Sequence, residues 1–217
     1  MNRSIPGLPH IQVNNIFCVG RNYEQHAREM NSPVPDEPII FLKPNSSILC
    51  DGGTVILPEQ SQNVHHEIEF VIAIGREGKN ISEKEAAQFI AGYGIGIDFT
   101  ARDLQSIAKK EGKPWSIAKG FDTFAPISNF LPADAHLPEK SFDLELKVNN
   151  KTVQKGVTQQ MIFSIITLIS YISKIFTLQP GDLIFTGTPE GVGPVKTGDH
   201  LTATLNTNLL TLNVDVQ

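Results

Sequence analysis

The sequence predicts an α+β fold built around a large mixed β-sheet, with few helices at its edges. Several short apolar segments rich in branched residues are expected to be strands: 15–20, 38–44, 64–75 and 92–99. Asn149-Asn150 stands between two alternating segments and is typical of a tight hairpin turn. Helical patterns are few and scattered, so we expect no regular strand–helix winding of a parallel sheet.

The composition is that of an ordinary globular protein and excludes some classes of partner. Of the 217 residues, 40% are hydrophobic and 19% are charged, so one catalytic domain over residues 1–217 is the default expectation. The formal net charge is −5 and no basic stripe is present, which argues against a nucleic acid partner. The most apolar run, residues 161–176, is too short and too interrupted by polar residues to span a bilayer.

Cysteine usage and the first residues bear on location. The sequence has only Cys18 and Cys50, which is no disulfide framework and fits a reducing cytoplasm. Residues 1–15 hold two prolines and few periodic cues. They do not show the basic segment followed by an apolar segment that is typical of a signal peptide. We therefore expect a cytoplasmic protein in which residues 1–15 form an extended arm.

A short polar helix follows the first buried strand and is expected to be a lid. Residues 21–30 are helix-compatible, and a proline-rich segment up to residue 38 ends the helix. Glycine on one side and prolines on the other make residues 21–38 a candidate lid segment. His26 and Glu29 are neighbours on one helical face. The pair is either a surface ion pair or a general base oriented by a carboxylate.

The segment 64–75 carries two acids at the start of a predicted buried strand. Residues two apart share a face of a strand, so Glu67 and Glu69 are expected on one face, about 7 Å apart along the backbone. His65 shares that face. Two like charges entering a core require a cationic side chain or a bound cation, unless both acids lie at a solvated rim.

A third acid ends a glycine-rich strand. Glycines at positions 92, 94 and 96 leave one face of that strand without side chains, which indicates close approach of a backbone or a ligand. Asp98 lies at the strand end, and residues 100–103 resemble a capped helix start whose free N–H groups suit an anion. Arg102 and Gln105 share the first turns of that helix. Residues 113–122 are expected to form a loop that holds Lys119.

The remaining segments are predicted to be scaffold. Thr158 is a candidate N-cap for a helix with an apolar stripe from Met161 to Ile175. Residues 183–186 form a predicted strand, and the following loop, 187–194, is glycine-rich. That loop lacks the lysine and the spacing of a phosphate-binding loop, and the dinucleotide-binding fingerprint is also absent.

The acids predict a site for a hard cation. Glu67, Glu69 and Asp98 offer only oxygen ligands, which favours Mg²⁺ or Mn²⁺ over zinc. No cysteine–histidine cluster has zinc spacing, although His65 and His66 beside the acids leave zinc as a weaker alternative. His65 is assigned to the surroundings of the site, and the role of His66 is left open.

Six blocks of the sequence resemble, in order, those of the fumarylacetoacetate hydrolase family, most closely its short acylpyruvase and oxaloacetate decarboxylase branch. The ordered set is specific and extends from about residue 15 to the end. The separate N-terminal domain of the founding enzyme has no room in this sequence, which favours smaller substrates. The blocks are Gly20-Arg21-Asn22-Tyr23, Phe41-Leu42-Lys43-Pro44, His66-Glu67-Ile68-Glu69, Asp98-Phe99-Thr100-Ala101-Arg102-Asp103, Lys119-Gly120-Phe121-Asp122 and residues 186–193, Thr-Gly-Thr-Pro-Glu-Gly-Val-Gly.

The resemblance implies a mixed β-sheet roll or sandwich, a homodimer, and a metal-dependent enzyme. It implies Mg²⁺ or Mn²⁺ on Glu67, Glu69 and Asp98. The implied catalytic residues are His26, Glu29 and Lys119, with a 2-keto acid or 2,4-diketo acid as the substrate. The implied substrate-binding residues are Arg21, Tyr23, Lys43, Arg102, Gln105 and Thr188.

The principal functional expectation is hydrolysis of the C–C bond of 3-acylpyruvates, such as acetylpyruvate or fumarylpyruvate, to pyruvate and a carboxylic acid. In it, His26 oriented by Glu29 activates water, and Lys119 stabilises the developing negative charge. Alternatives are oxaloacetate decarboxylation, oxaloacetate keto–enol tautomerisation, and the isomerases or decarboxylases of aromatic catabolism in the same family. A binding protein that holds a structural cation is a further alternative, but it would need neither Lys119 nor the His26–Glu29 pair.

Overall fold

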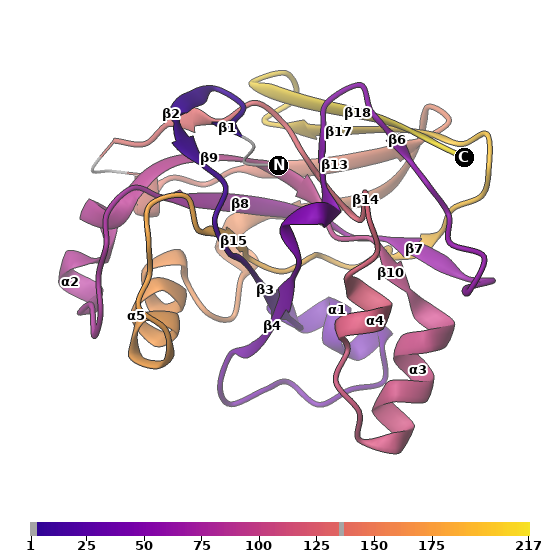
Figure 1. The fold of residues 1–217 in the computed structure, drawn as a ribbon, viewed down its shortest axis with the longest axis horizontal. Helices are drawn as coiled ribbons and strands as arrows, with labels where there is room; N and C mark the ends of the chain where they lie inside the picture. Colours follow the sequence, from indigo (N-terminus) through magenta and orange to yellow (C-terminus); the bar gives the residue numbers. More distant parts are fainter. Residues whose placement is uncertain (1–3, 135–136) are drawn as a thin grey trace.

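The computed structural model describes residues 4–134 and 137–217, so residues 1–3 of the predicted arm lie outside the described residues. The largest sheet has eight strands and is mixed, in the order β4-β3-β15-β8-β9-β11-β5, with β12 paired to β9 (Figure 1). These strands are β3 Ile16–Gly20, β4 Ile39–Lys43, β5 Ile48–Cys50, β8 Ile68–Ile74, β9 Ile90–Ile97, β11 Ala125–Ile127, β12 Leu131–Pro132 and β15 Leu183–Phe185.

Strand β8 is the buried centre of this sheet. All seven of its residues are buried, because antiparallel β9 and β15 flank it and side chains cover both faces. The long apolar run in the sequence reflects this double burial. The alternate glycines of β9 make room for neighbouring side chains: a Cβ on Gly96 would lie 2.4 Å from the ring of Phe185, and one on Gly94 would lie 2.9 Å from the ring of Phe130.

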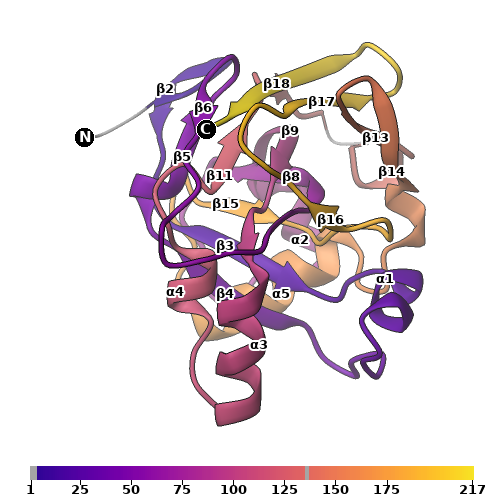
Figure 2. The ribbon, with the colours of Figure 1, turned by 90° about the vertical axis from the view of Figure 1, so that its right-hand side faces the viewer.

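A second sheet packs on the first and closes the core between them. It has five strands in the order β14-β13-β17-β18-β6. Phe70 on β8 stacks on Phe142 beside β13, with ring centroids 5.0 Å apart. Figure 2 shows β17 and β18 lying over the central strands, so the predicted α+β roll of packed mixed sheets is confirmed. The strands are β6 Thr54–Val55, β13 Asp143–Val148, β14 Lys151–Val157, β17 His200–Leu205 and β18 Leu210–Val216.

Two smaller sheets complete the strands. The arm forms a hairpin of β1 Ser4–Ile5 and β2 Leu8–Gln12, whose tight turn places Gly7 at φ 83°. A three-stranded sheet has the order β10-β7-β16, from Thr100–Ala101, Val64–His66 and Gly193–Pro194. The prediction of one strand over 64–75 is therefore wrong in one respect: Glu67 separates β7 from β8, and the chain changes sheet there.

The helices are short and peripheral, as expected. Helices α2 and α5 lie at one end of the large sheet, whereas α1, α3 and α4 lie beyond its other end, where α3 and α4 are neighbours and α1 stands apart from them (Figures 1 and 2). The α-helices are α1 Glu24–Glu29, α2 Glu83–Ala86, α3 Arg102–Glu111, α4 Ser116–Lys119 and α5 Ile165–Ile175. Single 3₁₀ turns are η1 Asn45–Ser47, η2 Ala87–Phe89, η3 Leu137–Glu139 and η4 Thr158–Gln160. None of the helices in the described ranges is long and apolar enough to cross a membrane.

One predicted helix start, at Thr158, and one predicted helix cap, at Thr100, are wrong for the same reason, although α3 does begin within residues 100–103. The hydroxyl of Thr158 accepts the N–H of Phe142, so the helix begins later, with Ser164 as its N-cap. The hydroxyl of Thr100 donates to Glu67 and does not cap α3. In both places a tertiary partner takes the side chain that a local pattern assigns to a cap. The predicted loop over 113–122 also contains the short helix α4.

Candidate active site

Three carboxylates meet where the chain leaves the small sheet for the large one. Glu67 occupies the break between β7 and β8, Glu69 is in β8, and Asp98 directly follows β9. The pairing of β8 with β9, extended by the Asp98 N–H donating to the Glu67 carbonyl at 2.8 Å, brings them together. All three are buried, and one ligand oxygen from each lies within 4.8 Å of the others. The predicted metal-ligating residues thus form one cluster.

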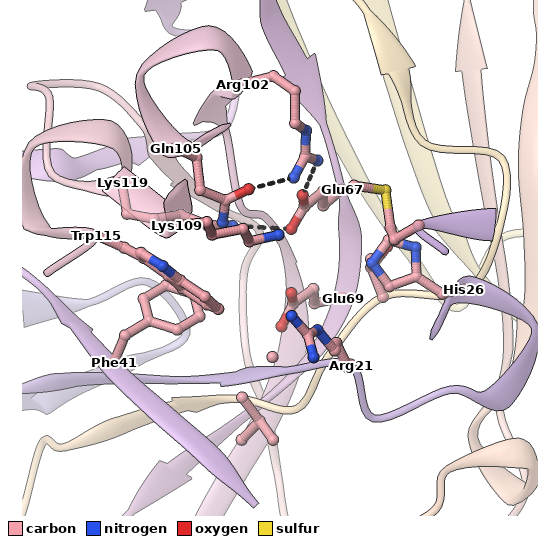
Figure 3. A pocket seen from close by; sticks show the side chains of 14 residues that line it. Arg21, His26, Phe41, Glu67, Glu69, Arg102, Gln105, Lys109, Trp115 and Lys119 are labelled. Carbon is pink, nitrogen blue, oxygen red and sulfur yellow. Dashed lines mark hydrogen bonds and ion pairs between the residues drawn. The ribbon is translucent and has the colours of Figure 1, made fainter. Parts of the chain in front are cut away.

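Cationic side chains neutralise two of these acids but not the third. Arg102 binds Glu67, and the Lys119 ammonium lies 2.9 Å from Glu67 and 2.5 Å from Asp98 (Figure 3). Glu69 accepts the N–H of Gly187 at 2.7 Å. No cationic side chain of the described residues lies within ion-pair distance of Glu69.

The electrostatics of the cluster fit a divalent cation. Burial alone would raise the pKa of Glu67, but Lys119 and Arg102 hold it well below its usual range. Burial, followed by the charges of Asp98 and Glu67, raises the pKa of Glu69 well above its usual range. A buried carboxylate that faces two others without a cation of its own is stabilised when a metal ion joins the cluster.

Lys43 does not lie on the wall of the cavity, where a substrate-binding residue is expected. It is not among the residues that line the cavity, and its side chain is fully buried. The ammonium pairs with Asp98 at 2.7 Å and donates to the carbonyls of Phe99, Lys119 and Phe124 at 3.0, 2.5 and 3.0 Å. The predicted role of Lys43 in substrate binding is therefore corrected: its ammonium holds Asp98 and the end of α4, which carries Lys119.

Lys43→Met is expected to destabilise the fold by about 3–5 kcal/mol, because it leaves buried carbonyls and part of the Asp98 charge without a partner. The free energy of unfolding in urea measures the loss. Lys79 is the matched control, since it also donates to two backbone carbonyls but is exposed. Lys79→Met should change stability by less than about 0.5 kcal/mol. Equal losses in both variants would contradict the role of Lys43.

Helix α1, in the predicted lid segment, presents His26 to the carboxylate cluster. His26 is buried and lines the cavity, and its Nδ1 lies 3.3 Å from Glu29. The other oxygen of Glu29 accepts the N–H of Gly191 at 3.0 Å, which ties α1 to the loop after β15. Burial lowers the pKa of His26 despite the opposing effects of Glu67 and Glu29, so the imidazole is neutral near pH 7. The structure thus brings His26 to the carboxylate cluster and in contact with Glu29, and their roles as a base and its orienting carboxylate stay a prediction.

Most other polar groups on the cavity wall present hydrogen-bond donors. Arg102, which can only donate, takes the carbonyl oxygen of Gln105 at 2.7 Å, and this leaves the amide N–H₂ of Gln105 for the cavity. Four basic side chains also line it. The lining is Val19, Gly20, Arg21, His26, Met30, Phe41, Glu67, Glu69, Arg102, Gln105, Lys109, Trp115, Lys119 and Thr188.

A buried glutamine, which we did not predict, fixes the direction of the Thr188 hydroxyl. Gln154 accepts the N–H of Ile68 at 3.1 Å and donates to the carbonyl of Pro189 at 2.9 Å. A backbone N–H can only donate and a carbonyl can only accept, so the amide orientation is determined. The Gln154 amide therefore donates to Thr188, at 2.9 Å, and the hydroxyl proton of Thr188 is free for an acceptor in the cavity.

The predicted roles of Tyr23 and of the histidines are revised. Tyr23 is buried, its hydroxyl has no hydrogen-bond partner among residues 4–134 and 137–217, and it lines a separate hollow with Glu24 and Glu190, so substrate contact is not supported. His66 is buried and binds Gln154 at 3.0 Å, which makes it part of the support of Thr188. His65 contacts Asn63 at 2.9 Å and does not line the cavity.

Comparison with known proteins agrees with this geometry. The family model described as "Fumarylacetoacetate (FAA) hydrolase C-terminal" matches residues 15–217. The chain belongs to the fumarylacetoacetate hydrolase family. A mitochondrial oxaloacetate tautomerase of Arabidopsis thaliana is 50% identical over 206 residues, which are 95% of this chain and 92% of the relative. A mitochondrial oxaloacetate decarboxylase of Dictyostelium discoideum is 50% identical over 184 residues, 84% of each chain.

The fold comparison identifies the same family. The crystal structure of fumarylpyruvate hydrolase from Pseudomonas aeruginosa, in complex with Mn²⁺ and pyruvate, superposes with a TM-score of 0.91 at 38% identity. The match covers 100% of this chain and 95% of that one. The family resemblance is thus confirmed, whereas the cytoplasmic location and the homodimer stay predictions, and the two relatives named above are mitochondrial.

Proposed function

We propose that the protein is a divalent-metal-dependent enzyme that acts on the 2-keto acid end of oxaloacetate, by keto–enol tautomerisation and decarboxylation. The observation that carries this proposal is the cavity itself, where a three-carboxylate cluster faces a wall of hydrogen-bond donors. A 2-keto acid is rich in acceptor oxygens and suits such a wall. The names of the two curated relatives support oxaloacetate over the acylpyruvates that the sequence favoured first.

Glu67, Glu69 and Asp98 would hold the metal, which we propose to be Mg²⁺ or Mn²⁺ because all three ligands are hard oxygens. When bound, the metal supplies Lewis-acid stabilisation of negative charge on the 2-keto oxygen. The protein's part is to keep the three acids together: Lys43 holds Asp98, and Arg102 holds Glu67.

The remaining residues have roles that follow from their positions. Lys119 brings a fully buried positive charge to the enolate that both reactions share. In tautomerisation, neutral His26 accepts a proton from C3 of the keto form, and the 2-oxygen gains one. In decarboxylation, the C3–C4 bond breaks, its electron pair stays on C3 as the pyruvate enolate, and CO₂ leaves. Thr188 and the amide of Gln105 donate to the substrate's oxygens.

Hydrolysis of acylpyruvates is the second candidate, and the His26–Glu29 pair favours it. An imidazole that faces the cluster and is oriented by a carboxylate can activate water for attack on the distal carbonyl. The structural similarity to fumarylpyruvate hydrolase supports the same reaction.

A substrate panel with product identification tests the proposal. Purified protein with Mg²⁺, Mn²⁺ or EDTA is given oxaloacetate and acetylpyruvate, and enol absorbance, pyruvate, CO₂ and acetate are followed. We expect metal-dependent loss of the oxaloacetate enol and formation of pyruvate. Turnover of acetylpyruvate alone would replace the proposal by the second candidate, and no turnover of either substrate would overturn both.

The Gln154–Thr188 hydrogen bond predicts a specific effect on substrate affinity. Gln154→Glu places an acceptor opposite Thr188, so the hydroxyl proton turns away from the cavity. We expect the KM for oxaloacetate to rise about tenfold, the same loss as in Thr188→Val, with no further loss in the double variant. Thr188→Ser should keep near wild-type KM. Metal affinity, measured by calorimetry, should be unchanged in all four, and additive losses would contradict the coupling.

A further inference from the structure

Two of the four basic side chains on the cavity wall have no acid to neutralise them. Arg102 and Lys119 are committed to the carboxylate cluster. Arg21 and Lys109 line the same cavity, yet within residues 4–134 and 137–217 no carboxylate forms an ion pair with either. The committed pair is buried, whereas Arg21 is half-buried and Lys109 is exposed. The cavity therefore has an inner end with paired charges and an outer end with free positive charge.

An aromatic side chain contacts one of the free cations and the residue next to the other. The Lys109 ammonium lies 5.2 Å from the ring centroid of Trp115, and Trp115 also packs beside Gly20, the residue before Arg21. Although Lys109 is exposed as a whole, partial burial and then the charge of Arg21 lower its pKa to about 8. Figure 3 shows both cations and Trp115 around the cavity that Glu67 and Glu69 face.

The backbone at Arg21 is consistent with a functional constraint. Arg21 adopts φ 58°, in the left-handed region that residues with a Cβ rarely occupy. Such conformations cost about 1–3 kcal/mol and persist where the surrounding structure requires them. Here the turn ends β3 and starts the lid, and it directs a long cationic side chain to the mouth of the cavity.

We propose that Arg21 and Lys109 form a subsite for a second carboxylate, so that the enzyme selects 2-keto acids with a distal carboxylate over their uncharged analogues. This inference rests on the proposed function, which places the 2-keto acid end at the cluster of Glu67, Glu69 and Asp98. A chain only a few atoms long, with anionic oxygens at both ends, matches an inner metal cluster and an outer cationic pair. Oxaloacetate has that chemistry, and acetylpyruvate lacks the second charge.

The subsite also bears on which reaction follows. Tautomerisation moves one proton from C3 to the 2-oxygen and keeps the distal carboxylate charged throughout. Decarboxylation converts that carboxylate into neutral CO₂, so cations that stabilise the carboxylate stabilise the ground state more than the transition state. Arg21 and Lys109 therefore favour tautomerisation over decarboxylation.

The test uses the only tryptophan of the sequence, Trp115, as a fluorescent reporter in the cavity. The full-length protein with saturating Mg²⁺ is mixed in a stopped-flow instrument with oxaloacetate or with its 4-methyl ester, which lacks only the distal charge. The variants are Lys109→Met, Lys109→Arg to restore the charge, and Lys110→Met as a matched exposed control outside the cavity lining.

We expect wild type to bind oxaloacetate about tenfold more tightly than the ester, and Lys109→Met to remove most of that preference. Lys109→Arg should restore the preference, and Lys110→Met should not alter it. The ratio of pyruvate formed to enol consumed should rise several-fold in Lys109→Met. Equal affinity of wild type for acid and ester, or equal losses for both ligands in Lys109→Met, would overturn the subsite.

The binding readout separates this inference from the proposed function, because fluorescence reports occupancy without turnover. Preferential binding of oxaloacetate without its conversion would support the subsite and refute the proposed reactions. Conversion of oxaloacetate with no preference over the ester would refute the subsite alone.

Discussion

Glu69→Gln is expected to abolish turnover while leaving the metal-free protein at least as stable as wild type. Glu69 is 1% exposed and faces Glu67 and Asp98, and no cationic side chain in the described part of the chain pairs with it. Glutamine keeps an acceptor for the Gly187 N–H but removes a buried charge that only a metal ion would neutralise. We expect metal affinity to fall and kcat/KM for oxaloacetate to drop by about a thousandfold, equivalent to about 4 kcal/mol of transition-state stabilisation.

Unfolding in urea with EDTA or with Mg²⁺ separates the two effects. Mg²⁺ should stabilise wild type, because it binds only the folded cluster, and it should not stabilise Glu69→Gln. Glu190→Gln, an exposed carboxylate on the neighbouring loop, is the matched control and should behave as wild type. A Glu69→Gln variant that still binds Mg²⁺ tightly, or that is strongly destabilised in EDTA, would contradict the assignment of Glu69 as a metal ligand.

The acids of the site could be predicted from the sequence because local rules place them. Alternation along a strand puts Glu67 and Glu69 on one face, and the neighbouring strand ends at Asp98. The structure keeps this arrangement although the chain changes sheet at Glu67, since the Asp98 N–H to Glu67 carbonyl bond holds the two ends together. The large mixed sheet was predictable for a similar reason: β8 is buried on both faces, and its sequence is correspondingly apolar.

The side chains that hold the site residues in place could not be predicted from the sequence, because their roles depend on contacts with residues far away along the chain. Lys43 binds groups that lie 55 to 81 positions away along the chain, and Gln154 binds groups 34 to 88 positions away. Lys43 stands in a family block, which pointed to substrate binding and not to this support, and no pattern around Gln154 marks it for a role in the site. Lys109 stands in the last turn of α3, where a basic side chain needs no further role, and only the three-dimensional packing places it beside Trp115 on the cavity wall.

His26→Ala is expected to separate the candidate reactions. Hydrolysis of acetylpyruvate needs a base to activate water, so its kcat should fall by about 10²–10⁴-fold. Oxaloacetate decarboxylation breaks the C3–C4 bond without attacking water, and its kcat should fall by less than about tenfold. Tautomerisation should fall with hydrolysis, because His26 is placed to move the C3 proton. Parallel assays at saturating Mg²⁺ measure all three rates.

Glu29→Gln tests whether Glu29 sets the pKa of His26 as the base or only holds α1 in place. It keeps an acceptor for the Gly191 N–H but removes the charge that raises the pKa of His26, so that pKa should fall further below 6.5. Because the neutral imidazole is the active form, the acid limb of the pH–rate profile should move to lower pH. An unmoved limb, or equal losses of all three reactions in His26→Ala, would mean that His26 closes the lid and is not the base. The His26–Glu29 geometry would then be explained by its hydrogen bond to the loop at Gly191 alone.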